Sequence, residues 1–159
     1  MKILYSVQAT GNGHISRAHQ LYPYLCTLGQ VDILLSGSNA TLQMDIPIKF
    51  RAQGMSLFYS ECGGLDYIKT FKAFSYRRIK REAQDLPVKN YDLIINDFDH
   101  ITARACKIHG VPSVQFGHQA SFMSNITQRP ESKSIIGESI LKYYAPATHY
   151  VGLHFERYE

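Results

Sequence analysis

The chain has 159 residues, of which 45% are hydrophobic and 19% are charged, and its formal net charge is +4. This composition is globular and excludes an intrinsically disordered chain, and the length suits one domain with a core. No apolar run is long enough to span a bilayer, and the N-terminus does not resemble a secretory signal, which argues against an integral membrane protein. The mild basicity favours an anionic partner.

The cysteines and histidines indicate neither a disulfide framework nor a metal site. Cys26, Cys62 and Cys106 lie far apart and form no CxxC pair, which is typical of reduced thiols in the cytoplasm. None of the seven histidines is paired at ligand spacing with another histidine or a cysteine. We therefore expect no metal.

Apolar runs of strand length alternate along the chain with helical patterns, which predicts βα units around a parallel sheet. The predicted strands are residues 2–7, 31–35, 48–52, 92–96, 113–116 and 149–153. The central runs are almost entirely apolar, as expected when helices cover both faces of a sheet. The fold class predicted is therefore α/β, a Rossmann-like doubly wound parallel sheet with helices on both faces.

Helical patterns fill the intervals between these strands. The predicted helices are residues 15–28, 67–83, 101–108 and 134–144. Gly29 and Gly110 follow two of them as C-terminal stops, and Pro23 predicts a kink or a late start in the first. We expect a single domain over residues 1–159. Residues 149–159 read as a strand leaving this domain, which suggests a fragment that lacks a C-terminal domain.

The segment with most chemical content follows the first strand and opens the first helix: Gly11-Asn12-Gly13-His14, with Arg17 one turn later. Glycines leave room for a ligand near the backbone, and a helix N-terminus favours an anion such as phosphate. Arg17 is expected to add a bidentate contact to that anion. A dinucleotide motif fits less well, because Ser16 stands where its third glycine would be and no acidic residue ends the second strand. His14 can accept a proton near neutral pH.

Three segments together resemble the GT-B glycosyltransferases, both the glucuronosyl/glucosyltransferase group and the MurG-type enzymes. They are the glycine loop with His14 and Arg17, the strand that runs into Asp97, and the stretch from Gly110 through Gly117-His118-Gln119. The resemblance implies that His14 is the base that deprotonates an acceptor hydroxyl and that Asp97 orients it. It places His118 and Gln119 near the acceptor, although the glutamate of the MurG-type motif is missing here.

The resemblance implies the N-terminal, acceptor-binding half of a GT-B fold in an inverting, metal-independent enzyme. Its donor would be a nucleotide sugar, UDP-linked by expectation, held by a C-terminal domain; no cofactor is expected. The substrate-binding residues it implies are Gly11, Asn12, Gly13, Arg17, His118 and Gln119. A nucleotide- or dinucleotide-binding module without chemistry is the alternative.

Ordinary structural roles remain open for several of these residues. His14 would then cap its helix, and His118 and Gln119 would belong to a solvated loop. Asp97 would cap the helix near Ile101, or Asp99 would be the functional acid instead.

Residues 67–82 carry six basic side chains among aromatic ones. Ile68, Phe71, Ser75 and Ile79 share one helical face, so an ordinary surface helix with its basic residues in water is favoured. Contact with anionic lipid headgroups is the functional alternative, which would place a cytoplasmic protein at the inner membrane face and suit a lipid-carried or envelope-related acceptor. No recognition motif supports nucleic-acid binding.

Overall fold

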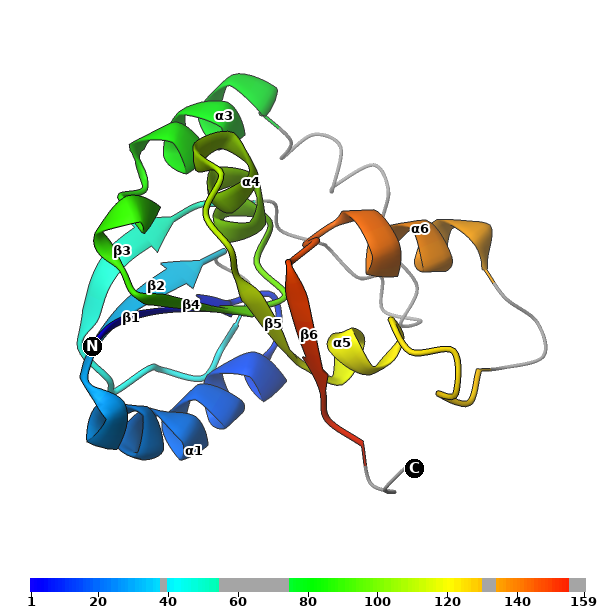
Figure 1. Ribbon diagram of the computed structural model, residues 1–159, viewed down its shortest axis with the longest axis horizontal. Coiled ribbons are helices and arrows are strands. Elements are labelled where there is room, and N and C mark those ends of the chain that lie inside the picture. Colours follow the sequence, from blue (N-terminus) through cyan, green and yellow to red (C-terminus); the bar gives the residue numbers. More distant parts are fainter. Residues whose placement is uncertain (38–39, 55–74, 130–133, 155–159) are drawn as a thin grey trace.

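The computed structural model describes residues 1–37, 40–54, 75–129 and 134–154, and it shows a six-stranded parallel sheet flanked by helices (Figure 1). The strands pair in the order β3-β2-β1-β4-β5-β6. Their bounds are β1 Lys2–Gln8, β2 Gln30–Ser36, β3 Ile48–Ala52, β4 Leu93–Asp97, β5 Val114–Gly117 and β6 His149–Gly152. The predicted α/β doubly wound class is therefore confirmed.

This strand order fixes where a ligand site can form. Every neighbouring pair is parallel, so all carboxyl ends lie at one edge of the sheet. The chain winds from β1 outward through β2 to β3, and then returns to add β4 on the other side of β1. β1 and β4 are therefore the switch point, where the connections from the two strands diverge and leave a crevice. Val7 of β1 is in register with Asp97 of β4.

The helices cover both faces of the sheet (Figure 1). Their bounds are α1 Asn12–Leu28, α3 Tyr76–Asp85, the 3-10 turn Val88–Asn90, α4 His100–His109, α5 His118–Ser121 and α6 Ile135–Tyr143. Helix α1 packs on one face, whereas α3 and α4 pack on the other. Helices α5 and α6 lie beyond β5 and β6.

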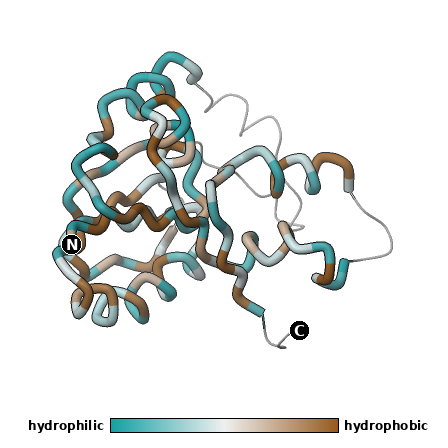
Figure 2. The backbone as a smooth tube through the Cα atoms, in the orientation of Figure 1, coloured by the Kyte–Doolittle hydropathy of each residue, from teal (hydrophilic) through white to brown (hydrophobic). Residues whose placement is uncertain are grey.

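The core consists of two layers because side chains alternate between the two faces of each strand. Leu4 and Leu34 pack beneath α3 and α4, while their neighbours Tyr5 and Ile33 pack beneath α1. The central strand β1 is hydrophobic along most of its length (Figure 2) and buried from Ile3 onward. This double coverage explains why the strand sequences are apolar runs rather than alternating ones.

The sequence-based boundaries need three corrections. Helix α1 begins at Asn12, and the late start that Pro23 suggested is wrong. Pro23 is exposed, so the carbonyl that it leaves without a donor can hydrogen-bond to water instead. Residues 67–74 of the second predicted helix lie outside the described residues, and α3 continues two residues past its predicted end to Asp85. Several strand limits also move by one residue, which is ordinary uncertainty at element ends.

No helix among the described residues is long and apolar enough to cross a membrane. In α3, Ile79 and Ala83 are buried, whereas Arg77, Lys80 and Arg81 are exposed. For the described part of residues 67–82, this agrees with the expected surface helix, and a contact with lipid would use the same exposed basic face.

Candidate active site

The sequence-predicted pair His14 and Asp97 meets at the carboxyl edge of the sheet. His14 lies in the first turn of α1, and its Nδ1 is 2.9 Å from Oδ1 of Asp97, the last residue of β4. Arg17, one turn further along α1, donates to Asp97 from Nη2 over 2.7 Å and from Nε over 3.0 Å. The three side chains form one cluster, which we call the edge triad.

The edge triad is nearly enclosed. The Asp97 side chain is fully buried, and those of His14 and Arg17 are 12% and 13% exposed. A buried carboxylate is costly unless it is paired and hydrogen-bonded, and Arg17 supplies both conditions with two donors. The cluster therefore holds a charged acid in the interior beside an imidazole that solvent reaches in part.

Two tautomers of His14 fit these positions. With the proton on Nδ1, the ring donates to the Asp97 carboxylate, which is a charge-assisted hydrogen bond. With the proton on Nε2, Nδ1 accepts from Arg17 Nη2, 3.1 Å away. The first is favoured because a carboxylate is the stronger acceptor and Arg17 Nη2 already donates to the same oxygen. This tautomer leaves Nε2 basic, and among the described residues Nε2 has no hydrogen-bond partner.

The structure separates the roles of Asp97 and Asp99. The Asp99 side chain accepts from the backbone N–H of Thr102 over 2.7 Å and caps α4. One sequence-based alternative gave this capping role to Asp97, but Asp99 is the residue that caps the helix. Asp99 is 1% exposed and makes no contact with His14 among those observed. Asp97 is the aspartate beside the histidine.

The turn that carries Asp97 is held in an unusual backbone conformation. Phe98 has φ +57°, and it is the one non-glycine residue with positive φ among the described residues. The side chain of Asn96 closes the turn: its Oδ1 accepts from Asp99 N over 2.6 Å and its Nδ2 donates to Asp99 O. Such strained residues persist only where their surroundings hold them, and they gather at functional sites.

Two further residues adjoin the edge triad, and sequence reasoning missed both. A Cβ added to Gly117, at the end of β5, would lie 3.1 Å from Asp97 Oδ1 and 3.4 Å from Arg17 Nη2. Glycine therefore lets β5 approach the triad. Tyr5 is fully buried, and its hydroxyl has no partner among the described residues. Burial raises the pKa of Tyr5, and the nearby Asp97 raises it further, so the phenol remains protonated.

The glycines of the loop have a different explanation from the one that the sequence suggested. Gly11 has φ −167°, which is ordinary extended backbone, and Gly13 lies within α1 without positive φ, so neither is needed for a tight turn. Apart from the chain neighbours and the backbone of α1 itself, no atom of the described residues lies within 4 Å of a Cβ added at either position. The space beside them is open, and the N-terminus of α1 has no side-chain cap and no acidic residue in its first turn. These features suit an approaching anion.

Asn12 and Arg17 have other partners than the substrate contacts expected of them. Asn12 Oδ1 accepts from the backbone N–H groups of Thr41 and Leu42, both over 3.0 Å, so its side chain anchors the segment after β2. Arg17 directs its Nε and Nη2 fork at Asp97. The fork expected to bind a phosphate is therefore occupied by a carboxylate.

His118 and Gln119 begin α5, directly after Gly117. His118 is exposed, and its Nδ1 donates to the carbonyl of Leu153 over 2.9 Å. Gln119 Oε1 is buried, and no described residue hydrogen-bonds to it. Both residues thus directly follow Gly117, the glycine that approaches the triad.

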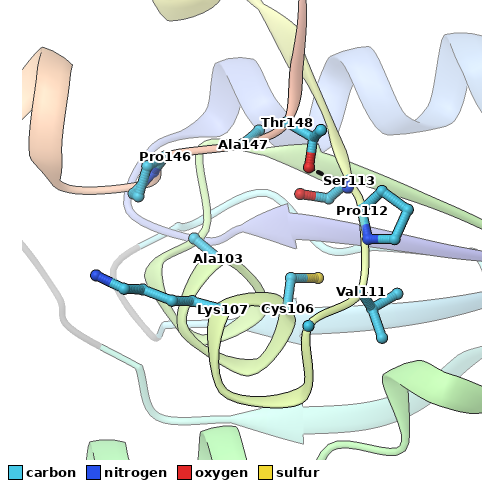
Figure 3. A pocket seen from close by; sticks show the side chains of 10 residues that line it. Ala103, Cys106, Lys107, Val111, Pro112, Ser113, Pro146, Ala147 and Thr148 are labelled. Atoms are coloured by element: carbon cyan, nitrogen blue, oxygen red, sulfur yellow. Dashed lines mark hydrogen bonds between the residues drawn. The ribbon is translucent and has the colours of Figure 1, made fainter.

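A pocket of about 540 Å³ lies away from the triad, between α4 and the starts of β5 and β6 (Figure 3). Ser113 N donates to Thr148 Oγ1 across it. Its one thiol is Cys106, and burial raises the pKa of that thiol to about 11. The thiol is therefore protonated at neutral pH and a weak nucleophile. Among the described residues, no three His, Cys, Asp or Glu side chains gather as a metal site would require.

Comparison with known proteins gives no family assignment. No protein-family model matches this chain, and no curated protein matches it. The conclusions about function therefore rest on the fold, the edge triad and the chemistry of its residues.

Proposed function

We propose that this chain is the N-terminal, acceptor-binding domain of an inverting glycosyltransferase. Its proposed donor is a nucleotide sugar, and UDP is the nucleotide we propose. The observation that carries the proposal is the contact of His14 Nδ1 with the buried Asp97 carboxylate, 2.9 Å apart at the switch point of the sheet. A histidine oriented in this way through one nitrogen offers the other as a general base. The resemblance of three sequence segments to GT-B enzymes agrees with this assignment.

In the proposed reaction, the acceptor hydroxyl transfers its proton to Nε2 of His14. The acceptor oxygen then attacks the anomeric carbon of the donor sugar, and the bond from that carbon to the nucleotide diphosphate breaks. The diphosphate leaves with the electron pair, and the configuration at the carbon inverts because the oxygen attacks from the face opposite the diphosphate. The negative charge of Asp97 stabilises the imidazolium that forms. The positive charge of Arg17 repels that imidazolium, but its hydrogen bonds hold the Asp97 carboxylate in place.

The open N-terminus of α1 beside Gly11 and Gly13 would bind a phosphate of the donor or the acceptor. A second domain would hold the rest of the donor. His118 and Gln119 would contact the acceptor from the neighbouring strand end. We further propose that the protein is cytoplasmic and that residues 67–82 contact anionic lipid at the inner membrane face.

The test is sugar transfer by the protein that contains both domains, measured as release of UDP. His14→Ala should lower kcat by ~100-fold or more, because the base is lost. His149→Ala is a matched control, since His149 is an exposed histidine on β6. A near-normal rate for His14→Ala would remove His14 from the chemistry, and transfer by residues 1–159 alone would contradict the two-domain proposal.

A dinucleotide-binding module without chemistry is the second candidate. The strand order observed here is the one common to dinucleotide-binding folds, and this observation favours it. Against it, β2 ends at Ser36 with no acidic residue to bind a ribose. Thermal stabilisation of residues 1–159 by NAD(P), with no effect of UDP-sugars on the longer protein, would favour the module over the transferase.

A further inference from the structure

The backbone that carries Asp97 is held from a distant part of the chain, by Tyr144 at the end of α6. Phe98 follows Asp97 directly, and its φ of +57° is disfavoured for a residue with a side chain. The Asn96 side chain closes the turn around Asp97 and Phe98, and both of its hydrogen bonds there go to the Asp99 backbone. Something further must retain Phe98 in this conformation.

Tyr144 makes contacts with each element around that turn. Its ring packs on the Phe98 ring with centroids 5.0 Å apart, and its carbonyl accepts from His100 Nδ1 over 2.5 Å. Its hydroxyl accepts from Gln8 Nε2 over 2.7 Å. Gln8 ends β1, and His100 begins α4. Tyr144 is 6% exposed and thus joins three segments that converge beside Asp97.

We infer that Tyr144 is a positioning residue: it retains Phe98 in the left-handed conformation and thereby directs Asp97 at His14. The functional role of this positioning rests on the proposed function, because His14 is the proposed base and Asp97 is its partner. Docking of α6 and assembly of the edge triad are then one event. If Tyr144 served only in core packing, its loss would destabilise the whole fold and would not affect the His14 proton more than the backbone amides of the core.

The test is an NMR measurement on this chain that requires no substrate. The reporter is exchange of the His14 Nδ1 proton, assigned by its loss in His14→Gln, relative to exchange of the Ile94 backbone amide in the middle of β4. Tyr144→Phe removes the bond to Gln8 and keeps the ring, so the His14 proton should exchange faster while the Ile94 amide does not. Tyr144→Leu removes the ring as well, and the His14 resonance should be lost.

Two further variants separate positioning from packing. Glycine adopts positive φ without penalty, so Phe98→Gly combined with Tyr144→Leu should recover the His14 resonance even though the ring contact is absent. Tyr143→Leu is the matched control, because Tyr143 is the adjacent tyrosine and is 66% exposed. It should leave the resonance unchanged.

Each outcome decides the inference. An unchanged His14 resonance in both Tyr144 variants overturns it, as does equal acceleration of the His14 and Ile94 protons, which marks general destabilisation. Absence of the resonance in the unmodified chain overturns it too, because there would be no bond to position. Failure of sugar transfer would remove the proposed function and leave this result intact.

Discussion

Two edges of the same sheet each hold an aspartate with a cation, and they differ in how the rest of the chain encloses it. Toward the amino-terminal edge, Asp32 Oδ2 accepts from Lys49 Nζ over 2.6 Å and from the Tyr91 hydroxyl over 2.8 Å. Lys49 is half exposed and the Asp32 side chain is 13% exposed. At the carboxyl edge, Asp97 is fully buried. The number of partners is similar, but access to water is not.

The difference shows what each cluster can do. Near the amino-terminal edge, partial burial raises the pKa of Asp32, but the bonds from Lys49 and Tyr91 outweigh it and leave the pKa below its usual value. Water can replace Lys49 there. At the carboxyl edge, no water reaches the Asp97 carboxylate, so its protein partners must satisfy it. A buried carboxylate held in place beside a partly accessible histidine is suited to acid–base catalysis, whereas a solvent-exposed ion pair is typical of a protein surface.

Removal of the cation from each pair should give the largest contrast. Arg17→Gln leaves Asp97 buried with one fewer charged partner, and we expect a loss of about 3 kcal/mol in the free energy of unfolding. Lys49→Gln should cost about 1 kcal/mol or less, because exposed ion pairs contribute little. Urea denaturation of both variants measures this. Equal losses would show that burial does not distinguish the two edges.

The two glycines at opposite ends of α1 sharpen the comparison. A Cβ at Gly29 would lie 2.1 Å from the Met1 carbonyl oxygen, so Gly29→Ala should destabilise the fold by ~1 kcal/mol or more. Gly13 lies within α1 beside open space, so Gly13→Ala should stabilise the fold by up to ~1 kcal/mol. Denaturation midpoints check both.

If a ligand approaches Gly13, the same Gly13→Ala variant should lose binding or transfer while it gains stability. Gain of stability with unchanged transfer would mean that the open space is not used. Loss of stability would mean that the loop is packed in a way that the structure does not show.

The smallest expected effect is the pH dependence of the amino-terminal edge. Because the pKa of Asp32 is lowered in the folded state, its contribution is present above the unfolded pKa of ~3.9 and is lost as pH falls through the folded value. Asp32→Asn should therefore be less stable than the parent by up to ~1 kcal/mol at pH 7, and the gap should close toward pH 2. A gap that persists at pH 2 would mean that the carboxylate charge is not its source.

Much of the site could be predicted from sequence because it depends on local order. The resemblance to GT-B enzymes led us to expect Asp97 beside His14, and the doubly wound sheet explains why they meet, because residues that follow β1 and β4 share the switch point. The choice between Asp97 and Asp99 could not be made, since both follow the strand within two residues and only the path of the turn decides which one caps α4. Asn12 and Arg17 were expected to bind substrate, and the sequence could not show that both side chains hydrogen-bond to the chain itself.

The sequence alone determined the alternation of strands and helices, hence the parallel sheet and the edge at which its loops gather, because hydrophobic periodicity and glycine stops act locally. Only the tertiary structure decided the conformation of Phe98, the approach of Gly117 and the contacts of Tyr144. Tyr144 lies far along the chain from Gln8, Phe98 and His100, and no local pattern marks it. Its contacts exist because α6 returns to the switch point, and such a return depends on the packing of the whole domain.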